Sequence, residues 1–125
     1  MIDTKTFVNR ESRWQDLYDH LKKMGFDVYS PGTKVGECTD PYVVIKNDGA
    51  MKHTSFSTSV DLYSVMCYVP KKAYSTLEPM VQSVKQAMKE LEPMFKWYGQ
   101  DSASFYDDNY KAHMISIEYQ NYKKL

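Results

Sequence analysis

Three histidines and a short acidic run are the first residues to test for chemistry. His20, His53 and His113 fall in three separate segments, and their spacing does not bring them together as metal ligands or as an acid–base pair. The run Asp107-Asp108-Asn109 lacks the alternating ligands and the closing glutamate of a calcium-binding loop. We therefore expect ordinary surface or half-buried histidines and a solvated acidic turn.

The two cysteines also predict no reactive site. Cys38 and Cys67 lie far apart in the sequence, and neither has another cysteine or a histidine at metal-ligand spacing. Cys67 has apolar neighbours, so a buried, inert thiol is expected there rather than a nucleophile. Two free thiols fit a reducing compartment, and a disulfide between them stays open.

The signature motifs of serine hydrolases, P-loop NTPases, dinucleotide-binding proteins and zinc proteases are absent from the sequence. We therefore predict no enzymatic activity, no metal and no cofactor. An enzyme whose site assembles from scattered residues remains the least favoured alternative.

Composition predicts one intracellular globular domain over residues 1–125. The chain is 42% hydrophobic and 26% charged, and its sixteen Lys and Arg balance sixteen Asp and Glu. This balance predicts no basic surface for nucleic acids. A signal peptide and a membrane-spanning run are not found in the sequence, so no membrane partner is expected. The eleven tyrosines and eight methionines suit a protein interface, or a tyrosine-rich core.

Apolar spacing predicts two helices. The first covers residues 10–25, with Gly25 as its C-terminal stop. The second covers residues 75–92, where Ser75 and Glu78 match a capping box.

The other apolar segments predict strands. They lie at residues 26–30, 41–47, 58–69, 94–98 and 111–120. Asp48-Gly49 is a favoured hairpin dipeptide, so the strand at 41–47 should end there. Residues 121–125 are expected to form a short flexible tail. The sequence therefore predicts an α+β fold, with a mostly antiparallel sheet of about four to five strands and two helices packed on one face.

The segment at residues 58–69 is apolar on both faces of the predicted strand. One face carries Val60, Leu62, Met66 and Tyr68. The other face carries Tyr63, Val65, Cys67 and Val69. Two helices cover only one face of a sheet well, and the second face needs cover from elsewhere. We interpret the second set as a contact between subunits of an oligomer. The alternatives are that loops at 30–40 and 100–109 fold over it, or that the sheet curls tightly around this strand.

Four segments carry a resemblance to a known family. They are TDPYVVIKNDG at 39–49, TSVDLYSVMCYVP at 58–70, TLEPMVQSVKQAMKEL at 76–91 and HMISIEYQNY at 113–122. In element order and hydrophobic pattern, over about residues 10–120, the chain resembles the tail terminator (tail completion) proteins of long-tailed phages. It is similar in the same way to their counterparts in headless contractile particles of the R-type bacteriocin kind. The resemblance contains no signature motif.

The resemblance implies a structural role. A hexameric ring would cap the last layer of the tail tube, stop its polymerisation and contact sheath, collar or head-completion proteins. The protein would assemble in the bacterial cytoplasm and then form part of a virion or phage-tail-like particle. Exposed tails would reach adjacent layers, and we expect Tyr122, Lys123 and Lys124 to contact a partner.

Two alternative functions stay open. Another virion part, such as a head–tail connector or a tail-assembly protein, would share this composition and differ in partner and stoichiometry. A small ligand-binding or regulatory α+β module would instead contain a closed apolar pocket with a few convergent polar groups.

Overall fold

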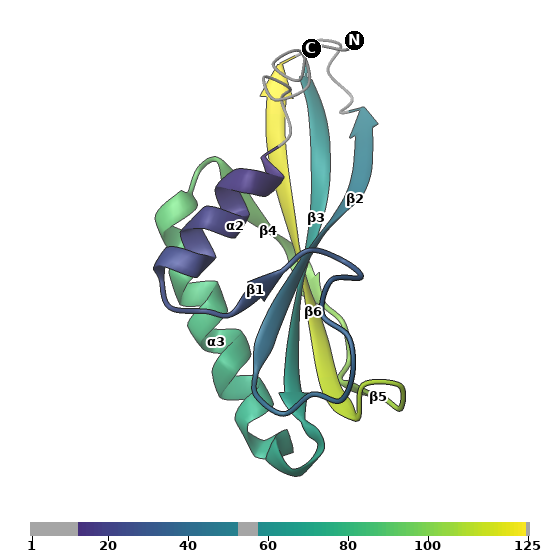
Figure 1. Ribbon diagram of the computed structural model, residues 1–125. Coiled ribbons are helices and arrows are strands. Elements are labelled where there is room, and N and C mark those ends of the chain that lie inside the picture. The colour runs from purple at the N-terminus through teal and green to yellow at the C-terminus, as the bar shows by residue number, and fades with distance from the viewer. Residues whose placement is uncertain (1–12, 53–57, 125) are drawn as a thin grey trace, which may run out of the picture.

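The computed structural model describes residues 13–52 and 58–124, which form two α-helices packed on one face of a twisted sheet (Figure 1). The helices are α2 (Trp14–Lys23) and α3 (Leu77–Met88), with short 3₁₀ helices at Lys71–Thr76 and Lys89–Leu91. The strands are β1 (Val28–Tyr29), β2 (Tyr42–Lys52), β3 (Thr58–Pro70), β4 (Phe95–Asp101), β5 (Phe105–Asp107) and β6 (Ala112–Lys124). The predicted α+β class is confirmed.

The sheet is built around the long pair β3 and β6. Its strand order is β1-β2-β3-β6-β4, and β5 pairs with β6 beside the end of β4. The pairs are antiparallel except β1 with β2, which is parallel over two residues. β3 and β6 pair along their full length, from Thr58 opposite Lys124 to Pro70 opposite Ala112. Together with β2 they form a ribbon that extends past both helices (Figure 1).

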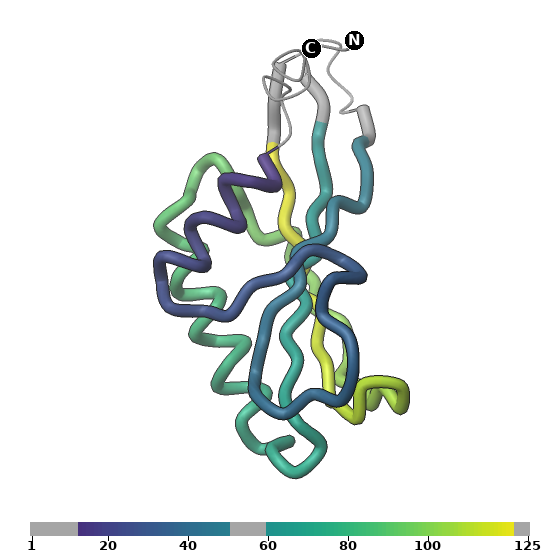
Figure 2. Tube along the Cα trace, viewed as in Figure 1, coloured from purple at the N-terminus to yellow at the C-terminus, as the bar shows by residue number. Residues whose placement is uncertain are grey.

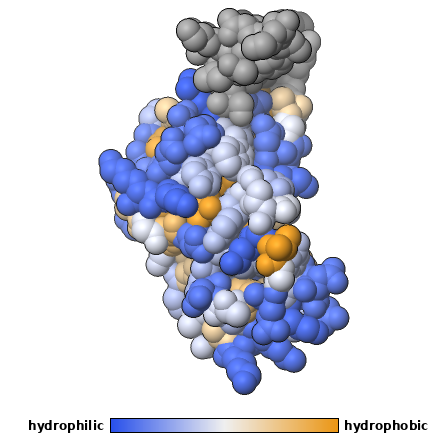
Figure 3. Space-filling view, viewed as in Figure 1, coloured by the Kyte–Doolittle hydropathy of each residue, from blue (hydrophilic) through white to orange (hydrophobic). Residues whose placement is uncertain are grey.

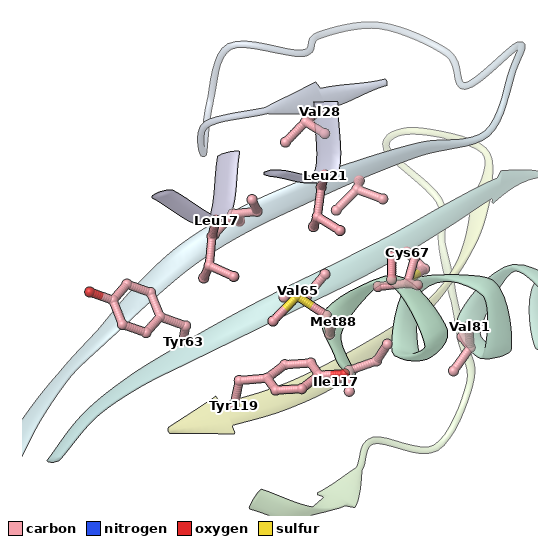
Figure 4. Packing of buried hydrophobic residues seen from close by; sticks show 14 of the residues in the cluster. Leu17, Leu21, Val28, Tyr63, Val65, Cys67, Val81, Met88, Ile117 and Tyr119 are labelled. Carbon is pink, nitrogen blue, oxygen red and sulfur yellow. The ribbon is translucent and has the colours of Figure 1, made fainter. Parts of the chain in front are cut away.

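The core lies between the two helices and the sheet (Figure 4). Its helix residues include Leu17, Leu21, Val81, Val84 and Met88, and its sheet residues include Val43, Ile45, Val65, Ile117 and Tyr119. Full burial of one Val or Leu side chain stabilises a fold by about 1.5–3 kcal/mol. The apolar stripes predicted for the two helices therefore supply the main packing of the fold.

Helix α2 ends at the predicted glycine. Gly25 has a φ of +97°, which an L side chain rarely adopts. Its amide donates to the Lys22 carbonyl, and the Phe26 amide donates to the Leu21 carbonyl, both at 3.1 Å. This pair of bonds is a Schellman motif, and it satisfies carbonyls left open at the end of the helix.

Helix α3 begins later than the sequence predicts. The chain first passes through the 3₁₀ helix at Lys71–Thr76, which contains Ser75. No side chain caps the start of α3, so the predicted capping box between Ser75 and Glu78 is wrong. Thr76 instead donates its hydroxyl to the Ala73 carbonyl at 2.6 Å.

Strand β2 continues through the Asp-Gly dipeptide that predicted a turn. Asn47 pairs with Tyr63 and Gly49 pairs with Leu62, so Asp48 is an extra residue in a β-bulge. Gly49 has a φ of +104°, and its amide donates to Oδ1 of Asn47 at 2.7 Å. The hairpin prediction is wrong because the same glycine conformation also suits a bulge.

The segment predicted as a flexible tail is mostly the end of β6. The backbone of residues 121–124 pairs with residues 58–61 of β3. Asn121 is buried and donates Nδ2 to the Met94 carbonyl at 2.7 Å. The flexible-tail prediction is therefore wrong for residues 121–124, while residue 125 lies outside the described residues. The side chains of Tyr122, Lys123 and Lys124 also lie outside them, so their contact with a partner stays a prediction.

Candidate protein-binding surface

The predicted subunit contact lies inside the protein. Its four residues, Tyr63, Val65, Cys67 and Val69, are each 0% exposed and belong to the core beneath α2 and α3 (Figure 4). The interface prediction for these four residues is therefore wrong. The physical reason is that they form the face that the two helices cover, which leaves no surface for a neighbouring subunit.

Tyr63 and Cys67 show how closed this face is. The Tyr63 hydroxyl accepts a hydrogen bond from the Arg13 amide at 2.9 Å. Its ring meets the Phe95 ring edge-on, with 5.6 Å between centroids. Burial raises the pKa of the Cys67 thiol to about 12, with a smaller contribution from Asp101. Cys67 is thus a buried thiol, as the sequence predicts.

The opposite face of the sheet is covered in part by residues 30–41. This loop connects β1 to β2 and crosses the face of the sheet (Figure 2). The Cys38 amide donates to the Tyr110 carbonyl, just before β6, at 2.7 Å. Apolar residues buried here include Cys38, Tyr42, Val44, Tyr68, Ala112 and Met114. The loop at 30–40 therefore covers a second face, but it is the face of Met66 and Tyr68.

Several of the tyrosines belong to this second cluster. Tyr42 and Tyr68 stack with 4.9 Å between centroids, and Tyr29 and Tyr110 meet them edge-on. The Lys34 ammonium lies 5.2 Å from the Tyr29 ring centroid and 5.6 Å from that of Tyr42. Burial is the main cause that raises the pKa values of Tyr42 and Tyr68. These tyrosines serve packing beneath a loop, and a hollow of about 130 Å³ is left beside them.

Four exposed apolar side chains lie on or beside strands β4 and β5. Met94, Trp97, Tyr98 and Phe105 are 41–48% exposed. Among the described strands, β4 ends the sheet order and pairs only with β6, so its outer backbone groups are open. Exposed aromatic side chains beside an open strand are typical of a place where another protein docks. We refer to Met94, Trp97, Tyr98 and Phe105, with the outer backbone of β4, as the β4 edge.

The β4 edge is irregular in its middle. The register with β6 shifts between Trp97 and Asp101, and Gly99 in this stretch has a φ of +91°. Bulges and lysines on an edge strand, here Lys96, limit indiscriminate pairing with other strands. The irregular stretch and Lys96 therefore make this edge a poor template for indiscriminate strand pairing. By contrast, the face seen in Figure 3 is largely hydrophilic, with isolated apolar surfaces.

Two open hollows lie between α3 and the β4–β5 segment. The larger, of about 420 Å³, is lined by Tyr74, Glu78 and Val81 on one side, by residues 101–104 on the other, and by Ile115. The smaller, of about 290 Å³, lies beside Trp97 and Tyr119. Both hollows are open and lined by polar as well as apolar residues, and Trp97 of the β4 edge lines the smaller one.

A charged cluster lies at the boundary between these hollows. The Lys85 ammonium lies 2.5 Å from Oδ2 of Asp101 and 4.5 Å from the Trp97 ring centroid. Trp97 donates Nε1 to Oδ1 of the same carboxylate at 2.9 Å. Asp101 thus holds both Lys85 and Trp97, which fixes how the exposed indole is presented.

The candidate chemical residues remain apart. His20 and His113 lie 2.8 Å and 3.2 Å from the backbone carbonyls of Ala87 and Lys71. His53 lies outside the described residues. Within residues 13–52 and 58–124, His, Cys, Asp and Glu do not form a group of three that could hold a metal ion. The same ranges contain no helix long and apolar enough to cross a membrane.

The acidic run at residues 107–109 forms a turn. Asp107 accepts hydrogen bonds through Oδ1 from the amides of Asn109 and Tyr110, at 2.9 Å and 3.4 Å. Asp108 is exposed and lies 3.1 Å from the Lys111 ammonium. The prediction of a solvated turn is confirmed.

The β4 edge is not predicted by the sequence pattern. Residues 94–98 are predicted to form a strand, with Phe95 and Trp97 on one face and Tyr98 on the other. That signal does not show whether the strand has one neighbour or two, because pairing with β6 is decided by distant residues.

The sequence matches no protein-family model and no curated protein at a significant level.

Proposed function

We propose that the protein is a structural subunit that binds copies of itself and other proteins through the β4 edge. In this proposal, six copies form a ring that caps the tail tube of a phage or phage-tail-like particle and ends tube polymerisation. The observation that carries it is the exposure of Trp97 and Tyr98 on the open strand β4, with exposed Met94 just before it and Phe105 on β5. Large exposed aromatics cost solubility unless they contact a partner.

A ring needs two different surfaces on each subunit, because each copy contacts its neighbours head to tail. The described part of the sheet has two open edges. One is the β4 edge. The other is β2 beyond Val44, where β1 no longer pairs with it. In the ring, the β4 edge of one copy would dock against the β2 edge of the next copy.

The order of elements supports the comparison with tail terminator proteins. An N-terminal helix is followed by a strand, a long antiparallel pair, an amphipathic helix and a long closing strand. In the proposal, the ribbon of β2, β3 and β6 beyond the helices reaches toward the tube or toward the next layer. Sheath, collar or head-completion proteins would bind the surfaces that the ring leaves free.

The small-ligand alternative finds less support. It predicts a closed apolar pocket, whereas the two hollows beside α3 are open and mixed in character. A different virion part remains compatible with the β4 edge and would differ in partner.

The test is assembly. Light scattering after size exclusion would measure the mass of the protein alone and after mixing with the tail tube protein of the same genome. We expect six-fold mass, or binding at tube ends that halts elongation in electron micrographs. A monomer that neither binds the tube nor changes its length would refute the proposal.

A further inference from the structure

A polar cluster interrupts the apolar outer face of the sheet at the β2 bulge. Lys46, Ser64 and Glu118 are direct neighbours across β2, β3 and β6. The bulge adds Asp48 to this row, and its carboxylate accepts a hydrogen bond from the Ser64 hydroxyl. Ser64 is only 6% exposed, so the contacts form under partial exclusion of water.

The Ser64 hydroxyl faces more carboxyl oxygens than it has hydrogens to donate. Its Oγ lies 3.0 Å from both Oε1 and Oε2 of Glu118 and also contacts Oδ2 of Asp48. A hydroxyl has one hydrogen to donate, while ionised carboxylates only accept. If Ser64 donates its hydrogen to Asp48, a hydrogen bond between Ser64 and Glu118 forms only when Glu118 is protonated and donates to the Ser64 oxygen. The geometry therefore fits one proton held between two carboxyl groups.

The surrounding charges indicate which group holds that proton. The Lys46 ammonium lies 3.8 Å from Oδ1 of Asp48, so a positive charge stands beside this end of the cluster. Burial is the largest effect that raises the pKa of Glu118 above its ordinary 4.5. The bond from Ser64 lowers this pKa, the charge and hydrogen bond of Asp48 raise it, and Lys46 lowers it.

No other strand brings a charge directly against Glu118 in the described residues. On the far side of β6, Lys96 of β4 pairs with Gln120. The neighbours of Glu118 on its own face of β6 are Ser116 and Gln120, both neutral. Asp48 and Lys46 of β2 are thus the charged groups that face it.

We propose that Asp48, Ser64 and Glu118 form a proton-sharing switch at the β2 bulge, and that release of the proton loosens this bulge. When the proton leaves to water, two negative carboxylates face one hydroxyl. Asp48 is the group free to move, because it is the unpaired residue of the bulge, whereas Glu118 is fixed within β6. The ribbon beyond the bulge would then change its packing with pH, whatever partner the protein binds.

Carbon-13 NMR of the labelled full chain tests the switch directly. A pH titration would follow the carboxyl carbons of Glu118 and Asp48 and the amide of Gly49, the residue after the bulge. We expect Glu118 to titrate above an ordinary glutamate and the Gly49 amide to shift with the same midpoint. An ordinary midpoint for Glu118, or a Gly49 amide that ignores its titration, would overturn the proposal.

Two variants separate the parts of the mechanism. Asp48→Asn removes the neighbouring charge, so the Glu118 midpoint should fall. Glu118→Gln keeps a hydrogen donor toward Ser64 without an ionisable proton, so the Gly49 amide should lose its pH response. The matched control is Glu90→Gln, an exposed residue after α3, which should keep that response. If Gly49 responds to pH equally in Glu118→Gln and Glu90→Gln, the switch does not exist.

Discussion

Lys85 and Asp101 connect helix α3 to the end of strand β4, with 2.5 Å between Nζ and Oδ2. Both side chains are only about a quarter exposed, at 22% and 25%. The pair is therefore less screened by water than a typical surface ion pair. It fixes the edge strand against the helix at the point where the register of β4 shifts.

Replacing Lys85 with Met should lower the free energy of unfolding by about 1 kcal/mol, since a partly buried carboxylate loses its partner. Asp101→Asn should act in the same direction and also release the Trp97 indole. Urea denaturation with the double variant measures the coupling between the two residues. Lys89→Met, an exposed position just after α3, serves as the control. Additive effects of Lys85→Met and Asp101→Asn would show that the pair contributes nothing.

Tyr98→Asp should weaken assembly while leaving the fold intact. Tyr98 is 44% exposed on the β4 edge, so a charge there costs little in the free subunit, within about 0.5 kcal/mol. In an interface the same charge would be buried without a partner. Light scattering gives the assembly state and urea denaturation gives the stability. Val35→Asp is the matched control, since Val35 is 74% exposed on the loop away from β4. Equal assembly of the two variants would remove the β4 edge as the contact.

Gly25→Ala should destabilise the protein by about 1–2 kcal/mol, because alanine at a φ of +97° is strained. Space is not the cause, since an added Cβ would meet no atom within 4 Å. The denaturation midpoint measures the loss. Ser83→Ala, on the exposed side of α3, provides the control. An unchanged midpoint for Gly25→Ala would mean that the Schellman turn is not needed.

Local patterns predicted much of this fold. The apolar stripes of the two helices and the end of α2 at Gly25 depend on short spacings that one segment contains. The assignment of the two faces of β3 failed for a different reason. Both faces are apolar, and period-two alternation separates them without showing which one the helices cover. The cover on the Met66 and Tyr68 side comes from a polar loop, residues 30–41, whose buried member is Cys38.

The candidate site was predicted less well than the fold. The numbers of tyrosines and methionines predict an interface or a core, and the structure contains both buried and exposed tyrosines. Tyr42 and Tyr68 are buried beneath the loop, while Tyr98 is exposed on β4. The residue type is the same in each case, so the long-range pairing of strands decides whether a tyrosine is buried or exposed.

Val65→Asp should prevent folding, because Val65 is 0% exposed within the core. A carboxylate buried there would lose its hydration and find no partner. Val65→Ala should fold with a free energy of unfolding lower by about 2 kcal/mol, from lost burial and the small cavity left behind. Circular dichroism and urea denaturation measure both. A folded Val65→Asp monomer that fails only in assembly would restore Val65 to a subunit interface and contradict the packing described above.

The two buried thiols should react more slowly with a disulfide reagent than an exposed cysteine does, and burial should keep them protonated to higher pH. Burial raises the pKa of Cys67 to about 12, and burial also raises that of Cys38. The folded pKa lies above the unfolded one, so the stability linked to the protonated thiols is complete below the unfolded value of 9.0. This stability is lost as the pH rises through the folded pKa.

At pH 8 (roughly the ordinary thiol range), a disulfide reagent should react slowly with both cysteines in the native protein and rapidly in urea. Cys67→Ser separates the two rates. Rapid reaction of Cys67 in the native state would show that the core opens at this strand.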